Sequence, residues 1–178
     1  MKAKLVLWFS LLVLLLLVGW TIANITWAKS YDKTLNGVIY RLGTEHRDLV
    51  EDVTIHIKGS IKKSWTREKA FQGIIVIENE KLPFNNDGNE VSITFDDKGY
   101  GMLIRDADWE NQGISPYGLI FMNEDKVAIA PFEHENGISK GWEGGNGIVM
   151  AAPAQSYDEG MRIAGELMKK FHPNLHQN

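Results

Sequence analysis

Residues 53–58 read Val-Thr-Ile-His-Ile-Lys, and this short stretch decides the kind of fold that the sequence predicts. Its apolar residues alternate strictly with polar ones, which is the period of a strand with one buried and one solvated face. Residues 91–95, Val-Ser-Ile-Thr-Phe, repeat the alternation. Both stretches therefore predict half-buried strands of an antiparallel sheet.

More continuous apolar runs lie beyond this centre, at residues 71–78 and 118–122. They predict central strands that are covered on both faces. Shorter strands are expected at 101–104, 126–130 and 147–150, and turn-forming clusters of Asn, Asp and Gly separate the strands at 85–88, 96–99 and 123–125. Because such short turns join strands that pair locally, we expect an antiparallel meander and not a βαβ alternation.

The C-terminal segment changes to a helical period. Ser156 and Glu159 form a capping-box pattern, and Pro173 stops the helix. The apolar side chains fall on one helical stripe, at Tyr157, Met161, Ala164, Met168 and Phe171. We expect an amphipathic helix packed on one face of the sheet, with Gly160 and Gly165 allowing close approach to a strand. The fold class is therefore α+β.

An uncharged apolar run, LVLWFSLLVLLLLVGWTIA, occupies residues 5–23. A helix of about 20 such residues crosses a hydrocarbon core of about 30 Å. The sequence thus predicts a transmembrane anchor in residues 1–27, a polar tether at 28–36 and one extracytoplasmic domain at 37–178. A cleaved signal peptide with a weak site at 21–23 is the alternative, and the protein would then be secreted.

Charge and composition narrow the class of protein. The formal net charge is −4, and the only charges before residue 28 are Lys2 and Lys4, so the domain is acidic and a nucleic-acid partner is not expected. The chain has no cysteine, which excludes thiol nucleophiles and cysteine-based metal sites. The order of a short basic head followed by an apolar run favours a cell-membrane protein whose C-terminal domain lies outside the cytoplasm.

No motif with strong chemistry is present, and we predict no cofactor. Oxygen ligands alternate at Asp106, Asp108 and Glu110, but the glycine and glutamate that an EF-hand loop needs are missing, so these are weak metal candidates in a strand connection. The glycines at 144–147 lack the Lys-Ser/Thr of a phosphate-binding loop. The sequence does not identify an enzyme, and no catalytic residue is predicted.

The best candidate for recognition is the glycine-rich polar loop 132–147, which carries His134, Trp142 and Glu143. Polar loops on a rigid sheet are common binding sites, and tryptophan offers a large contact surface. Trp109, in the preceding loop, is a second candidate for partner binding. The alternative is that Trp142 folds back and covers the sheet edge.

Three glycine-and-apolar patterns, at 71–77, 99–103 and 150–154, carry a resemblance. The chain resembles small, uncharacterised membrane-anchored extracytoplasmic proteins of Gram-positive spore-forming bacteria, which implies this architecture and no catalytic residue. We therefore expect an accessory, sensor or binding module that contacts the membrane through its N-terminal helix, together with another envelope or membrane protein. The alternative is a cell-envelope hydrolase with a carboxylate-based site.

Overall fold

The computed structural model describes residues 2–24, 26–43, 50–64, 69–78, 90–105, 115–135 and 138–175. These residues form two helices and ten strands along the described chain. The helices are α1 (Lys2–Asn24) and α2 (Tyr157–Met168). The strands are β1 (Thr26–Arg41), β2 (Val50–Ser64), β3 (Ala70–Glu78), β4 (Val91–Thr94), β5 (Tyr100–Arg105), β6 (Ser115–Met122), β7 (Val127–Pro131), β8 (His134–Glu135), β9 (Ile138–Ser139) and β10 (Ile148–Ala152).

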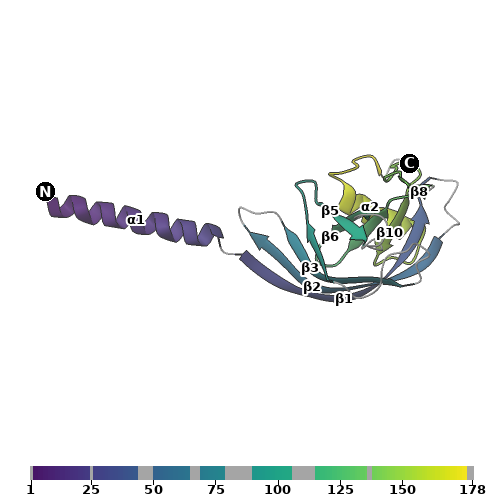
Figure 1. Cartoon of the computed structure of the whole chain (residues 1–178), viewed down its shortest axis with the longest axis horizontal. Coiled ribbons are helices and arrows are strands. Elements are labelled where there is room, and N and C mark those ends of the chain that lie inside the picture. The colour runs from purple at the N-terminus through teal and green to yellow at the C-terminus, as the bar shows by residue number, and fades with distance from the viewer. Residues whose placement is uncertain are drawn as a thin grey trace.

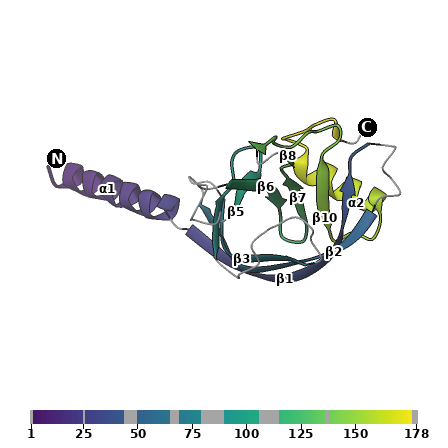
Figure 2. The same cartoon turned by 45° about the vertical axis from the view of Figure 1, so that its right-hand side comes forward.

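Eight of these strands form one antiparallel sheet in the order β4-β3-β2-β1-β10-β7-β6-β5. The sheet curves until it is nearly a barrel, with β1, β2 and β3 on one side and β5, β6, β7 and β10 on the other (Figures 1 and 2). The antiparallel sheet and the C-terminal helix are confirmed. The plain meander is wrong, because β10 lies between β1 and β7 and joins two separate meanders.

The edges of the sheet, β4 and β5, are joined by the turn at residues 96–99. Asp96 N donates to Tyr100 O at 2.9 Å, and Gly99 has a φ of 88°, a left-handed value that glycine adopts readily. Gly101 lies so close to β4 that a Cβ there would approach Ile93 Cγ2 to 2.1 Å. The missing side chain therefore lets the two edges of the sheet approach each other.

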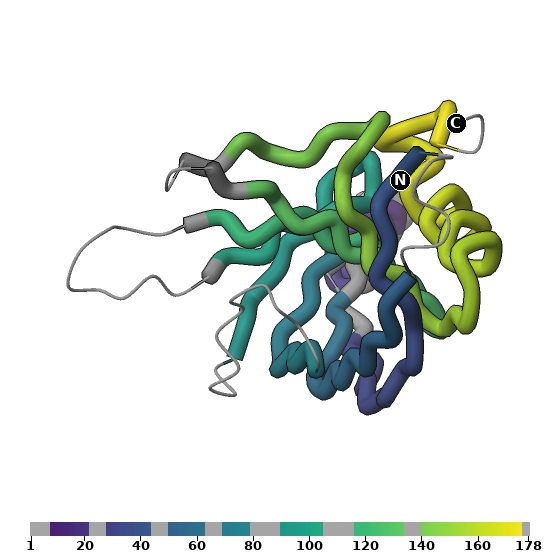
Figure 3. Tube along the Cα trace, turned by 90° about the vertical axis from the view of Figure 1, so that its right-hand side faces the viewer, coloured from purple at the N-terminus to yellow at the C-terminus, as the bar shows by residue number. Residues whose placement is uncertain are grey.

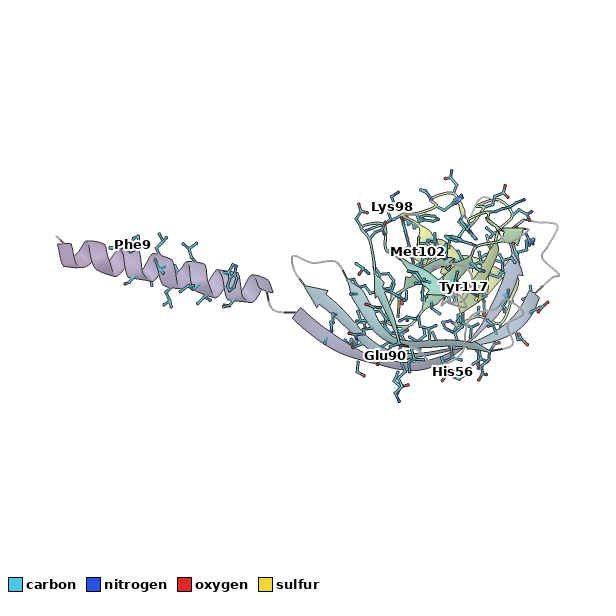
Figure 4. All side chains as sticks on the ribbon, in the orientation of Figure 1. Phe9, His56, Glu90, Lys98, Met102 and Tyr117 are labelled. Atoms are coloured by element: carbon cyan, nitrogen blue, oxygen red, sulfur yellow. The ribbon has the colours of Figure 1, made fainter. Side chains whose placement is uncertain are left out.

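The interior of the barrel is filled with apolar side chains, which come from the inward-facing positions of the strands. Tyr117, labelled in Figure 4, points into this interior. The buried members are Tyr31, Val53, Ile55, Ile57, Phe71, Ile75, Ile77, Ile93, Phe95, Leu103, Tyr117, Ile120, Met122, Val127, Ile129, Met150 and Ala152. Such an interior is a packed core.

A second core lies outside the barrel, where α2 covers β1, β10, β7 and β6 (Figure 3). The strand side chains beneath the helix include Val38, Tyr40, Phe121 and Val149. A Cβ at Gly160 would lie 2.7 Å from Tyr40 Cε1, so the predicted close approach of α2 at this glycine is confirmed. Strands β7 and β10 are consequently buried on both faces, as their continuous apolar sequences require.

The N-terminal half of β1 contains residues 28–36, for which the sequence predicted a tether. These residues pair with β2 in a continuous ladder from Thr26↔Ser64 to Tyr40↔Val50. Lys29 and Lys33 lie on the same face of β1 as the buried Tyr31, and they pair with Glu124 at 2.7 Å and with Asp125. Because Lys29 and Lys33 are charged although they lie on the inward face, this segment lacks the alternation of apolar and polar residues from which a strand is predicted.

Helix α1 extends away from the domain, and Phe9 on it is far from the barrel (Figures 1 and 4). From Trp8 to Trp20 its apolar side chains are exposed at nearly consecutive positions, so every face of this part of the helix is apolar. Within the described residues, no helix combines the length and the hydropathy that a membrane crossing requires.

Candidate functional site

The predicted recognition loop is shaped as a small hairpin followed by a return to the sheet. His134 lies in β8 and is paired with Ser139 of β9. Backbone hydrogen bonds close the base of this hairpin, with Glu133 N donating to Gly141 O and Lys140 N donating to Glu133 O. The loop therefore has regular backbone structure on both sides of its tip.

Trp142 folds back against the domain, as the alternative interpretation expected. Its Nε1 donates to Ile148 O at 2.9 Å, and its ring lies 6.0 Å from the rings of both Phe171 and His172. Phe171 in turn contacts Tyr100 and Phe121. The indole is half-buried and joins the loop to the end of α2, while Glu143 beside it is exposed.

Arg41, at the end of β1, holds the same loop from the other side. Its Nη2 lies 2.6 Å from Glu133 Oε1, and its Nη1 donates to Asn146 O at 2.7 Å. The structure thus brings Trp142 and Glu143 to one end of the sheet. Trp109 and the weak metal candidates Asp106, Asp108 and Glu110 lie outside the described residues, and no three metal-ligating side chains cluster elsewhere in the described chain.

A different constellation lies on the outer face of the sheet, across β1, β2 and β3. Thr34 Oγ1 is 2.9 Å from His56 Nδ1, and His56 Nε2 is 3.1 Å from Glu78 Oε1. Thr34 and His56 are direct cross-strand partners, whereas Glu78 is diagonal to His56. His56 points away from the barrel interior in Figure 4. Thr34, His56 and Glu78 therefore form a row on this face, in which the hydroxyl neighbours the imidazole and the imidazole neighbours the carboxylate.

A pocket of about 390 Å³ begins where this row ends. It lies at the corner between β1 and the start of α2, and Ala154 N donates to Asn36 O across its edge at 3.1 Å. The pocket is open to solvent and mostly polar. Its lining residues are Thr34, Leu35, Asn36, Pro153, Ala154, Gln155 and Glu159.

The N-terminus of α2 forms the wall opposite Thr34. Glu159 N donates to Ser156 Oγ at 3.3 Å, which confirms the predicted cap at Ser156. The side chain of Glu159 accepts a hydrogen bond from Gln155 N at 2.8 Å, one residue before the amide that a capping box would use. The wall is thereby fixed by its own hydrogen bonds.

Sequence reasoning missed this row. The period of residues 53–58 correctly placed His56 on the solvated face of its strand, but the partners of the imidazole depend on strand register. Thr34 lies in the segment of β1 that was predicted as a tether. Glu78 is the last residue of β3, which is separated from β1 by β2 in the sheet. The continuous apolar run at 74–77 left the face of Glu78 undetermined, and nothing local identified Thr34.

Comparisons with protein-family models, with curated proteins and with solved structures find no match to this chain. The interpretation of its sites therefore depends on the geometry and chemistry of its own residues.

Proposed function

We propose that this protein is a membrane-held accessory or sensor module, in which α1 inserts into a lipid bilayer. The exposed surface of α1 carries this proposal. Trp8, Phe9, Leu16 and Trp20 are 74%, 66%, 65% and 68% exposed, and neighbouring leucines are similarly exposed. Exposed apolar area costs about 25 cal/mol per Å² in water, so a bilayer is the environment that suits such a helix.

The domain beside the bilayer is proposed to bind a protein or an envelope component through its outer surface. The barrel interior is occupied by its own side chains, so a partner has to be met outside it. The hairpin β8–β9 and the exposed Glu143 after it are held to the domain by Arg41 and Trp142. Such a loop presents polar contacts with little loss of conformational entropy on binding.

Flotation of the full chain with phosphatidylcholine–phosphatidylglycerol vesicles tests the role of α1. We expect the wild-type protein to float and the double variant Leu12→Arg/Leu15→Arg to stay in the dense fraction. Each arginine at the centre of a bilayer costs about 2.5–3.5 kcal/mol. Met102→Arg, at a similarly exposed apolar residue of β5, is the matched control and should float.

Equal flotation of the wild type and the double variant would contradict the proposal. For protein that does float, extraction at alkaline pH separates a helix embedded in the hydrocarbon from one lying at the surface, because only the embedded helix resists extraction.

We also propose that the domain lies outside the cytoplasm, as the order of the basic head and the apolar run favours. External protease should then degrade the domain on intact cells.

A further inference from the structure

We propose that Thr34, His56 and Glu78 form an acyl-ester hydrolase site, with Thr34 as the nucleophile at the mouth of the pocket. The proposal goes beyond membrane attachment and does not depend on it. In place of the carboxylate-based site expected of an envelope hydrolase, it has a hydroxyl activated by an imidazole. Nucleophile, base and orienting group within hydrogen-bond reach of one another are the geometric signature of such sites, whatever their sequence order.

The hydrogen bonds define the role of each group. When His56 Nε2 carries the proton, it donates to Glu78 Oε1, 3.1 Å away. Nδ1 is then an acceptor, and the Thr34 hydroxyl donates to it over 2.9 Å. Glu78 therefore holds the tautomer in which the imidazole acts as a base toward Thr34.

The reaction balances without a cofactor. Thr34 Oγ1 bonds to the ester carbonyl carbon while its proton passes to His56 Nδ1. The bond to the leaving alcohol then breaks, and the alcohol takes that proton, which leaves an acyl-threonine. Water attacks the acyl carbon and gives a proton to Nδ1. Rupture of the bond to Oγ1 releases the acid, and Thr34 regains the proton.

The pocket indicates the class of substrate. Its volume of about 390 Å³ and its polar lining suit a short acyl group on a hydroxyl-rich alcohol, to which Asn36 and Gln155 can hydrogen-bond. The first turn of α2 contributes the positive end of the helix dipole, partly offset by Asp158 and Glu159 in that turn. His56 and Glu78 have side chains 38% and 54% exposed, so we expect slow turnover, confined to activated esters.

The test measures hydrolysis of p-nitrophenyl acetate by the full chain in detergent micelles. Thr34→Ala and His56→Gln should each lower the rate by about tenfold or more, and Thr34→Ser should retain it. Glu78→Gln should lower it less. Ser92→Ala, which removes an exposed hydroxyl on β4 of the same face, is the matched control and should leave the rate unchanged. p-Nitrophenyl octanoate should react more slowly than the acetate.

Mass spectrometry after rapid acid quenching should find an acetyl group on Thr34. Three outcomes would overturn the proposal. The wild type could hydrolyse the ester no faster than Thr34→Ala, in which case the row serves only to pair strands, and thermal unfolding of the variants would report that role. Thr34→Ala could keep a rate that His56→Gln loses, which would make the imidazole itself the nucleophile. The quenched wild-type protein could also carry no acetyl group on Thr34.

Discussion

Two buried tyrosine hydroxyls lack a hydrogen-bond partner among the described residues, Tyr31 inside the barrel and Tyr40 beneath α2. Burial is the main cause that raises the pKa of both hydroxyls above the usual value near 10, with smaller contributions from Asp125 at Tyr31 and from Tyr157 at Tyr40. Each of these two hydroxyls therefore keeps its proton in the folded state at a pH where the same hydroxyl in the unfolded chain has lost its proton.

The variant Tyr40→Phe tests this at the residue scale. Removing an unpaired buried hydroxyl should leave the free energy of unfolding unchanged or raise it by up to about 1 kcal/mol. Above about pH 10 the unfolded tyrosine ionises and the folded one does not, so wild-type stability should fall with rising pH. The variant should show a flatter alkaline limb in urea unfolding.

Tyr157→Phe is the matched control, because its ring packs on Tyr40 at 5.1 Å and its hydroxyl lies 3.5 Å from Gly43 O. That variant should not be more stable than the wild type. A loss of more than 1 kcal/mol in Tyr40→Phe at neutral pH would show that the Tyr40 hydroxyl makes a stabilising hydrogen bond.

At the scale of elements, a glycine pair shapes the curved half of the sheet. Gly59 and Gly73 are direct partners on β2 and β3, at inward positions next to Phe71. A Cβ at Gly73 would lie 2.2 Å from Lys58 O and 2.5 Å from Gly59 Cα, so both strands would have to separate. Glycine in a strand interior commonly marks such close backbone approach.

Gly73→Ala should therefore lower the free energy of unfolding by about 2–3 kcal/mol, measured by chemical denaturation. Gly145→Ala is the matched control, because a Cβ there meets nothing within 4 Å. It should change stability by less than about 0.5 kcal/mol. A loss in Gly73→Ala no larger than that in Gly145→Ala would contradict the role assigned to the close approach of β2 and β3.

Elements with a local signature could be predicted from the sequence. Residues 53–58 and 71–78 lie in β2 and β3, and the cap at Ser156 begins α2. The first half of β1 could not be predicted, because Lys29 and Lys33 occupy its inward face and their partners lie in a distant hairpin tip. The position of β10 depends on pairing across more than a hundred residues, which no local pattern encodes.

The candidate sites show the same contrast between features with a local sequence pattern and features that depend on strand pairing. Trp142 and Glu143 became candidates because a glycine-rich loop with an aromatic residue has a recognisable composition. The row from Thr34 to Glu78 is created by register alone, since a slip of one residue would turn each side chain to the other face. The three residues of the row can be read from the sequence, but their proximity in the fold cannot.

At the scale of the whole molecule, ion pairs join the two halves of the barrel. Lys29 and Lys33 of β1 contact Glu124 and Asp125 at the tip between β6 and β7. Hydrogen bonding to Lys29 is the main cause that lowers the pKa of Glu124, and hydrogen bonding to Lys33 is the main cause that lowers that of Asp125. Both carboxylates are exposed, so salt should screen these contacts.

We expect the protection of amides 123–126 against hydrogen exchange, taken relative to the intrinsic exchange rate at the same pH, to decrease in 1 M salt. It should decrease again below about pH 4 as the carboxylates are protonated. The direction of the pH effect follows from the lowered pKa values of the two carboxylates in the folded state. Their stabilisation of the tip is present above the pKa values of the unfolded chain, near 4, and is lost as the pH falls through the lower pKa values of the folded state. Lys33→Ala should show the faster exchange without added salt, whereas Lys58→Ala, on the opposite face of the neighbouring strand, should not. Exchange that is insensitive to salt would assign the order of the tip to its backbone hydrogen bonds.

The direct passage from α1 into β1 has a mechanical consequence. One residue, Ile25, separates the helix from a strand that pairs with β2 from Thr26 to Tyr40 and with β10 near its end. A pull on α1 along the strand would load many ladder hydrogen bonds at once, because β1 is held along its whole length. Traction on the helix would reach the centre of the sheet before it reached either edge, so the sheet would not unravel strand by strand from an edge.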